Sequence, residues 1–275
     1  MPRFKRILSY IFFILAVVFV VFFLLLEDKY VVPVVMYHNI APTDVPQANT
    51  VTPESFARQM AYLKRHGYRV MKVDDLVQGI KMGKMFPHNS VVITFDDGYK
   101  DNYIYAFAVL KKYQFPAIVF VVSDLIGQEG YLNWDELKEM GRNGFTVGSH
   151  TRHHMYLPSL TSVMQIDQIR GSKRIIEEGL GLHVDYFSYP AGGFSEGIKS
   201  IVKNSDYKAA FTTNRGFDRF NKDVFELKRI RFNDDDSPLV LWAKLSGYYN
   251  LFRKVRQPSL EEGILTPERI IAGEK

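Results

Sequence analysis

The sequence predicts an α/β protein with parallel strands, folded either as a closed barrel or as an open wound sheet. From Val31 onward, seven or eight short apolar runs alternate with stretches of helical periodicity. Strands separated by helices pair in parallel, because a parallel connection needs a crossover of a dozen residues or more. Of the 275 residues, 47% are hydrophobic, which suffices for one well-packed domain.

The expected elements follow one another along the chain with few gaps. The apolar runs predict strands at residues 31–37, 68–71, 91–95, 117–122, 145–147, 186–189, 209–213 and 227–232. Helical patterns predict helices at residues 103–113, 134–142, 161–179 and 196–205. Another helix should begin at Thr52, because a hydroxyl N-cap is followed by Pro53 at the first helical position. Gly67 should end it.

Residues 7–26 form an uncharged stretch that only Ser9 and Tyr10 interrupt with polar groups. As a helix it would be about 30 Å long, which matches the hydrocarbon core of a bilayer. Three basic residues precede it and two acidic residues follow it, so the N-terminus should be cytoplasmic. We therefore expect a single-pass signal-anchor in residues 1–29 and a cell-membrane protein whose remaining chain is extracytoplasmic. The alternative is a cleaved signal peptide, but the apolar core exceeds the usual length of about 7–15 residues.

The rest of the chain is predicted to form one catalytic domain, residues 30–250, followed by a peripheral tail, residues 251–275. The absence of cysteine excludes disulfides and thiolate zinc sites. Net charge is +5, three units of which precede the apolar stretch, so nucleic-acid binding has little support. No obligate protein partner is evident.

Four polar residues lie at or just beyond the ends of three expected strands. They are His38, Asp96, Asp97 and His150. Because functional residues collect where parallel strands end, these side chains can face one pocket. For any one of them, a cap or turn residue is the simpler explanation, and the coincidence of all four favours a site.

The histidines and carboxylates have the composition of a metal site. His150 and His154 are four residues apart, so one helical turn would place both rings on the same side. Two imidazoles and one carboxylate suit zinc or a similar first-row metal and leave a position open for water. The second carboxylate can then accept a proton during attack on a carbonyl. On geometry alone, either Asp96 or Asp97 could take either role.

The run Thr94-Phe95-Asp96-Asp97-Gly98-Tyr99, followed by His150-Thr151-Arg152-His153-His154, resembles the first two motifs of the polysaccharide deacetylases. These are the NodB-like enzymes, family 4 of the carbohydrate esterases. The resemblance implies a distorted (β/α) barrel of about seven strands that removes acetyl groups from sugars. It also implies that Asp96 is the general base and that Asp97, His150 and His154 hold a divalent metal, zinc above all, or else nickel or cobalt.

The third motif of that family is altered. The chain reads Ser188-Tyr189-Pro190-Ala191, so Ser188 replaces the arginine that orients the base. The resemblance still implies that the backbone N–H of Ala191 can stabilise an oxyanion. Arg229 is a candidate replacement for the missing positive charge, although a solvated strand edge would also explain it.

The usual general acid of the family is also missing, because no histidine follows His183. The segment Tyr37-His38-Asn39-Ile40 is similar to the permuted arrangement of the biofilm poly-N-acetylglucosamine deacetylases. There the acid comes from the start of the domain, which implies that His38 protonates the leaving amine. A histidine that merely ends a strand is the alternative.

Together these features predict a membrane-anchored, metal-dependent deacetylase that hydrolyses N-acetyl groups of an extracellular or cell-wall hexosamine polysaccharide. Two alternatives remain. One is a catalytically impaired glycan-binding protein on the same fold, and the other is an O-acetyl esterase that uses the same metal and base.

Overall fold

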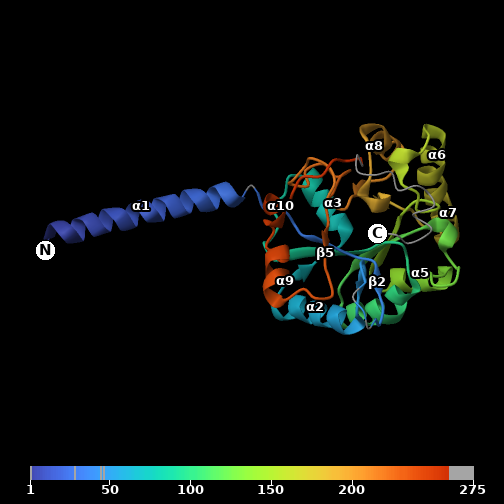
Figure 1. Ribbon diagram of the computed structural model, residues 1–275, viewed down its shortest axis with the longest axis horizontal. Coiled ribbons are helices and arrows are strands. Elements are labelled where there is room, and N and C mark those ends of the chain that lie inside the picture. The colour runs from blue at the N-terminus through green and yellow to red at the C-terminus, as the bar shows by residue number, and fades with distance from the viewer. Residues whose placement is uncertain (1, 28, 44, 46, 260–275) are drawn as a thin grey trace.

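Parallel strands form the centre of the fold in the computed structural model, which describes residues 2–27, 29–43, 45 and 47–259 (Figure 1). The strands are β1 (Val34–Tyr37), β2 (Asn39–Ile40), β3 (Thr50–Val51), β4 (Arg69–Val70), β5 (Ser90–Phe95), β6 (Ala117–Val121), β7 (Phe145–Ser149), β8 (Tyr186–Ser188), β9 (Ala209–Phe211) and β10 (Ile230–Arg231). Every pairing between them is parallel. Their order, β10-β1-β5-β6-β7-β8-β9 with β4 beside β5, confirms about seven parallel strands.

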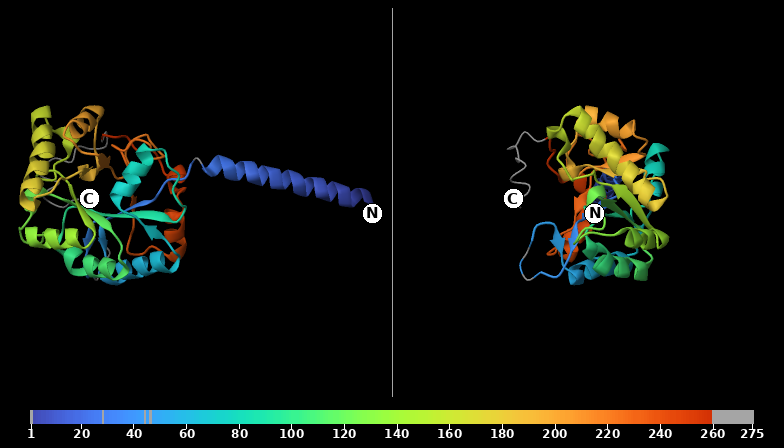
Figure 2. Two further views of the ribbon diagram at one scale, coloured as in Figure 1. Left: turned by 180° about the vertical axis from the view of Figure 1, so that it is seen from behind. Right: turned by 90° about the vertical axis from the view of Figure 1, so that its right-hand side faces the viewer.

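Helices surround this sheet on its outer face (Figure 2). They are α2 (Pro53–Arg65), α3 (Val73–Lys81), α4 (Ala108–Tyr113), α5 (Trp134–Arg142), α6 (Ser162–Ile166), α7 (Ser172–Leu180), α8 (Glu196–Lys203), α9 (Pro238–Leu245) and α10 (Tyr249–Phe252), whereas α1 (Pro2–Glu27) stands apart from the sheet. The Thr52 hydroxyl accepts a hydrogen bond from the Ser55 N–H, which confirms the predicted N-cap of α2. The predicted helices at 103–113 and 161–179 each contain a π-helical segment, Asn102–Phe107 and Asp167–Gly171.

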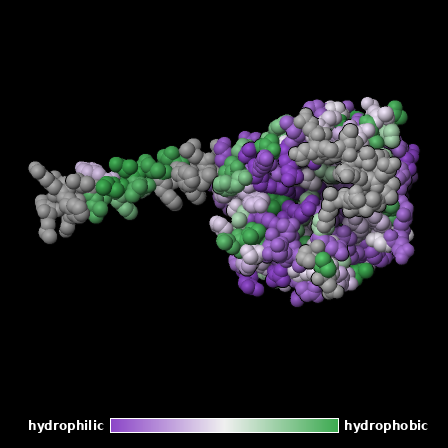
Figure 3. All heavy atoms as spheres, viewed as in Figure 1, coloured by the Kyte–Doolittle hydropathy of each residue, from purple (hydrophilic) through white to green (hydrophobic). Residues whose placement is uncertain are grey.

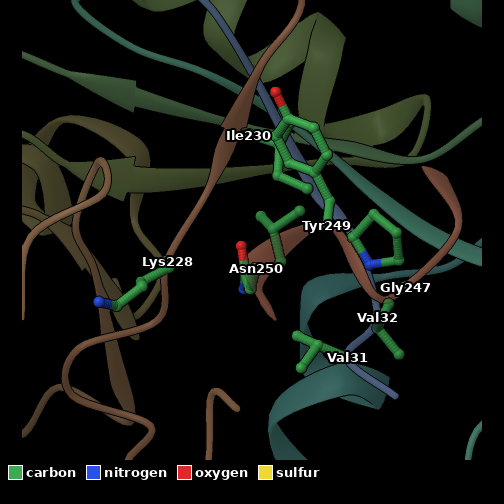
Figure 4. A pocket seen from close by; sticks show the side chains of 9 residues that line it. Val31, Val32, Lys228, Ile230, Gly247, Tyr249 and Asn250 are labelled. Carbon is green, nitrogen blue, oxygen red and sulfur yellow. The ribbon is translucent and has the colours of Figure 1, made fainter. Parts of the chain in front are cut away.

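The two ends of the strand order meet through one short contact. Phe211 of β9 forms a parallel bridge to Leu227, and the chain runs on from Leu227 into β10, which pairs with β1. Near this junction a small crevice lies between Val31, Ile230 and Asn250, with Lys228 extending away from them (Figure 4). The segment from Leu227 to β10 therefore connects β9 with β1, and closure of the predicted barrel depends on this segment.

Successive residues of each strand face opposite sides, which divides the apolar core into two parts. Val91, Ile93 and Phe95 pack with the helices, whereas Val92 belongs to a second cluster with Phe120 and other inward-facing side chains. Apolar residues thus fill the inside of the sheet and leave polar side chains to its carboxyl ends.

Helix α1 projects away from the domain (Figure 1). Most of its described side chains are apolar and exposed, for example Phe12 at 75% (Figure 3). Among the described residues, no helix is both long enough and apolar enough to span a membrane. The structure therefore does not support the transmembrane segment predicted at residues 7–26.

The predicted division into 1–29, 30–250 and 251–275 stays a prediction. The first residues of the expected tail contact the domain, since the Phe194 N–H donates to the Pro258 carbonyl at 3.1 Å. Residues 260–275 lie outside the described part of the chain.

Candidate metal centre and active site

The site begins where β5 ends. The Asp96 N–H continues the strand pairing by donating to the Tyr37 carbonyl at 3.0 Å, and then the chain turns sharply through Asp97 and Gly98, with φ of 70° and 75°. A side chain at Gly98 would come within 2.9 Å of Val121, and left-handed backbone disfavours it as well. The turn sends the two adjacent carboxylates in different directions.

Asp97 faces two histidines. Its Oδ1 lies 3.4 Å from His150 Nε2 and 3.3 Å from His154 Nε2. One ligand atom from each of the three residues lies within 4.8 Å of the others. His150 follows β7 and is buried, whereas the side chain of His154 is 40% exposed. The three residues implied as metal ligands therefore converge.

The expected helical turn between the two histidines is wrong. Residues 150–154 form a loop in which Thr151 and His154 adopt left-handed backbone, with φ of 69° and 57°. The Thr151 hydroxyl accepts from the His154 N–H at 3.0 Å and stabilises this loop. The rings nevertheless lie close, with centroids 4.9 Å apart.

Hydrogen bonding sets the tautomer of His150. Its Nδ1 lies 2.8 Å from the Ser188 carbonyl, which can only accept, so Nδ1 carries the proton and Nε2 presents a lone pair to Asp97. Burial lowers the pKa of His150 to about 4, against the nearby carboxylates that raise it. The ring is therefore neutral near pH 7, the form that binds metals.

These residues fit a divalent metal. Asp97 Oδ1 is buried and has no hydrogen-bond partner among the described residues. A buried carboxylate oxygen without a donor is unfavourable unless a cation faces it. One carboxylate and two neutral imidazoles are the donors that zinc, nickel and cobalt accept.

Asp96 has a different partner. Arg229 Nη1 donates to Asp96 Oδ1 at 2.7 Å and Nη2 donates to Oδ2 at 2.6 Å, a bidentate pair. Arg229 is fully buried, so the alternative of a solvated strand edge is excluded. Burial alone would raise the pKa of Asp96, but the charge and hydrogen bonds of Arg229 hold it well below its usual value.

Two hydroxyls also accept hydrogen bonds from Arg229, and its Nε donates to the Thr212 carbonyl at 3.0 Å. Its Nη2 also donates to Ser188 Oγ at 2.9 Å, and its Nη1 donates to Thr94 Oγ1 at 3.2 Å. Ser188 stands where the third motif of the family has its arginine. Its hydroxyl contacts Arg229, the residue just before β10, and Arg229 supplies the positive charge. The sequence interpretation missed Thr94, although a single hydroxyl in an apolar strand run was a usable signal.

His38 follows β1 directly. Burial lowers its pKa, while the carboxylates of Asp97 and Asp96 oppose that shift. Its Nδ1 is buried and has no hydrogen-bond partner among the described residues. The Asn102 side chain donates to the His38 carbonyl at 2.7 Å and so fixes the backbone there, a contact that the sequence did not reveal.

Ala191 and His153 lie on the two loops beside the site. Ala191 adopts φ 50° and ψ 15°, a left-handed conformation that costs about 1 kcal/mol in a non-glycine residue, and it is exposed. His153 turns away from the metal ligands and pairs with Asp124 at 3.1 Å.

The comparisons with known proteins agree with this geometry. The family model described as "Polysaccharide deacetylase" matches residues 83–210. The protein YxkH of Bacillus subtilis (strain 168), named a "putative polysaccharide deacetylase", is 30% identical over 199 residues, which cover 72% of this chain and 70% of that protein.

The chain belongs to the polysaccharide deacetylase family. A further relative is the poly-beta-1,6-N-acetyl-D-glucosamine N-deacetylase of Staphylococcus aureus (strain MRSA252), 26% identical over 68% of this chain and 69% of that enzyme.

Solved structures of this deacetylase fold are also similar. The Streptococcus pyogenes deacetylase PplD in complex with acetate aligns with a TM-score of 0.72 and 28% identity, covering 78% of this chain and 97% of PplD. IcaB from Ammonifex degensii aligns with a TM-score of 0.68 and 25% identity, covering 80% and 97%. His38 and Arg229 lie outside residues 83–210, so the family match does not include them.

Proposed function

We propose that the protein hydrolyses N-acetyl groups of an extracellular or cell-wall hexosamine polysaccharide of the poly-β-1,6-N-acetylglucosamine kind. The observation that carries this proposal is the convergence of the three ligand atoms of Asp97, His150 and His154 beside a carboxylate held by Arg229. The S. aureus relative named for that polymer and the acetate complex of PplD support it.

In this proposal Asp97, His150 and His154 hold a divalent metal, with zinc first and nickel or cobalt as alternatives. When bound there, the metal would act as a Lewis acid on the acetyl group and lower the pKa of water. His150 is pre-oriented for this task by the Ser188 carbonyl.

Asp96 is the proposed general base. Arg229 keeps it ionised and fixes both of its oxygens, which still have free lone pairs to accept a proton from water. A base held in one geometry favours attack on the acetyl carbon. The N–H of Ala191 would donate to the carbonyl oxygen as negative charge develops there.

His38 is the proposed general acid, which delivers a proton to the sugar nitrogen as the C–N bond breaks. Because burial lowers its pKa, the ring is neutral before substrate binds. Negative charge that develops on the substrate would raise that pKa and allow His38 to carry the proton. Acetate and a free sugar amine are the products.

Acetate release tests the proposal. The full-length protein is incubated with zinc and either N-acetylglucosamine oligomers or an O-acetyl ester, next to Asp96→Asn. We expect release from the oligomers and its loss in Asp96→Asn. Release only from the ester would favour the O-acetyl esterase, and retention of glycan without release would favour the glycan-binding protein.

The role of His38 has a separate test. His38→Ala should lower kcat by about 100-fold, the usual contribution of a general acid, with bound zinc unchanged. Loss of zinc from this variant would instead make His38 a metal ligand.

We further propose that the reaction takes place outside the cytoplasm, at the cell membrane. The order of charges around residues 7–26 and the extracellular nature of such polymers support this location. Protease added to intact spheroplasts should digest the domain and release it from the membrane fraction. Protection from the protease until the cells are lysed would contradict the location.

A further inference from the structure

A polar groove lies between the residues that lead into β3 and the residues from β10 onward. Its volume is about 450 Å³, within the range of about 300–1,000 Å³ for small-molecule sites. One wall comes from residues 47–50 and the other from residues 231–235; the polar side chains considered below are those of Gln47, Asn49, Thr50, Arg231, Asn233 and Asp235. Strand β2 starts one residue after His38, so the groove opens at the same end of the sheet as the site.

Hydrogen bonds and an ion pair hold the second wall in place. Asp234 accepts from the Thr52 N–H at 2.6 Å and from its hydroxyl at 2.7 Å. Lys244 pairs with Asp236 at 2.6 Å and donates to the Arg231 carbonyl at 2.9 Å. A wall fixed before binding loses little conformational entropy when a ligand arrives.

Arg231 connects the groove with the reacting groups. It lines the groove and is exposed. Strand register also places it near the reacting groups, because Arg231 of β10 pairs with Met36 of β1, two residues before His38. No hydrogen bond or ion pair of the Arg231 side chain is found among the described residues, so its guanidinium group is available to a ligand.

The chemistry of the lining indicates a neutral, hydroxyl-bearing ligand. Side-chain amides of Gln47, Asn49 and Asn233 and the charges of Arg231 and Asp235 offer donors and acceptors of both kinds. The exposed charges of Arg231 and Asp235 are opposite in sign, and the third charged lining residue, Asp234, already accepts hydrogen bonds from Thr52, so the free charges favour neither a polyanion nor a polycation. Phe232, the aromatic residue among the described lining, is 2% exposed, so hydrogen bonds rather than ring stacking would hold the ligand.

We propose that this groove binds a flanking N-acetylated sugar unit of the same polymer, one that lies beyond the immediate neighbour of the unit being deacetylated and that a dimer therefore lacks, and that Arg231 is the residue that selects polymer over short fragments. This inference rests on the proposed function and names a second point of contact with the same substrate. Arg231 donates to an oxygen of the flanking sugar and so contributes binding that a short substrate cannot use.

The test compares chain lengths. kcat/KM is measured for β-1,6-linked N-acetylglucosamine dimer and hexamer with wild type, Arg231→Gln and Arg231→Lys. We expect the hexamer-to-dimer ratio to fall about tenfold in Arg231→Gln, mainly through KM, because one charge-assisted hydrogen bond is lost. Arg231→Lys should recover part of the ratio. Lys84, which follows α3 in the chain, is an exposed cation that does not line this groove. Lys84→Gln is therefore the matched control and should keep the wild-type ratio.

An unchanged ratio in Arg231→Gln would overturn the inference. A fall in kcat for dimer and hexamer alike would also overturn it, because Arg231 would then act on His38 rather than on the flanking sugar. Asp235→Asn tests whether the ligand is neutral. If this variant lost kcat/KM only on partly deacetylated hexamers, the groove would bind a cationic sugar unit instead. Absence of acetate release from any oligomer by wild type would reject the proposed function itself.

Discussion

Asp96 and Asp97 are neighbours in sequence, yet their surroundings differ in the one respect that matters for their chemistry. Asp96 is neutralised by a cation of the protein itself, since both of its oxygens accept from Arg229. Asp97 faces two imidazole nitrogens, and within the described chain its buried Oδ1 has no donor. One carboxylate is complete as the chain folds, whereas the other still needs a positive charge from outside.

This difference supports the proposed roles of Asp96 as the general base and Asp97 as a metal ligand. A carboxylate already paired with arginine gains little from a metal and keeps a fixed orientation toward water. A buried carboxylate oxygen that faces two imidazole lone pairs gains a great deal from a divalent ion. The geometry thus favours the assignment that the family resemblance implies and that strand-end geometry alone left open.

Removing Arg229 should have the largest effect on this comparison. Arg229→Met leaves Asp96 buried without its cation, and breaking a buried pair costs about 3–5 kcal/mol. We expect a loss of that size in the free energy of unfolding measured in urea, together with loss of acetate release. The double variant Asp96→Asn/Arg229→Met should recover part of the stability. A loss below about 1 kcal/mol in the single variant would mean that the pair is not coupled as its geometry indicates.

Added zinc should stabilise the folded protein through Asp97 and not through Asp96. At a hundredfold excess over the dissociation constant, a ligand stabilises the folded state by about 2.7 kcal/mol. We expect a corresponding rise in Tm for wild type and no rise for Asp97→Asn or His154→Ala. Arg229→Met should keep the rise. If zinc raised the Tm of wild type but not that of Arg229→Met, zinc binding at Asp97 would depend on the Asp96–Arg229 pair, and the two carboxylates would not be independent.

Acid should remove the contribution of the Asp96–Arg229 pair. The folded-state pKa of Asp96 lies well below its usual value, so the pair stabilises the protein above the unfolded-state pKa of about 4 and loses this effect as pH falls through the folded-state pKa. The stability difference between wild type and Arg229→Met should therefore narrow below about pH 4. Urea unfolding at pH 7 and pH 3 measures it. A difference that widens in acid would contradict the pKa direction.

Ser188→Ala should have the smallest effect. The Ser188 hydroxyl accepts from Arg229, but two stronger bonds to Asp96 remain, so we expect a cost of about 1–2 kcal/mol. The Ser188 carbonyl, which orients His150, is unchanged in this variant, so the zinc-induced rise in Tm should remain. Disappearance of that rise would show that the hydroxyl supports the metal ligands as well as the base.

The structural features that depend on residues close in sequence could be predicted from the sequence. The strands and most helices follow from apolar periodicity, and the Thr52-Pro53 start of α2 follows from its cap. Helix α9 begins with the same signature, Ser237-Pro238, which the interpretation overlooked. The conformation of residues 150–154 was not predictable in this way, because Thr151 and His154 adopt left-handed backbone without a glycine to signal it.

The environment of Asp96 could only be guessed from the sequence. Arg229 is 133 residues away, and local patterns carry no information about such a distance. The cluster of Asp97, His150 and His154 was easier to predict from the sequence, because two short motifs contain all three residues. Arg229 and Arg231 are only two residues apart, and the local pattern does not distinguish them, yet the structure buries Arg229 and exposes Arg231.

The late position of Arg229 in the chain affects how the protein matures. Contacts between distant residues form slowly, because the intervening chain must first be ordered. The strand order places β10, the last strand of the chain, against the first. During synthesis, the residues of the metal cluster are all present well before Arg229, so an unfinished chain could gather its ligands but would have no oriented base. Hydrolytic activity should therefore appear only after the final strand has docked, which protects a partly folded chain from acting on its surroundings.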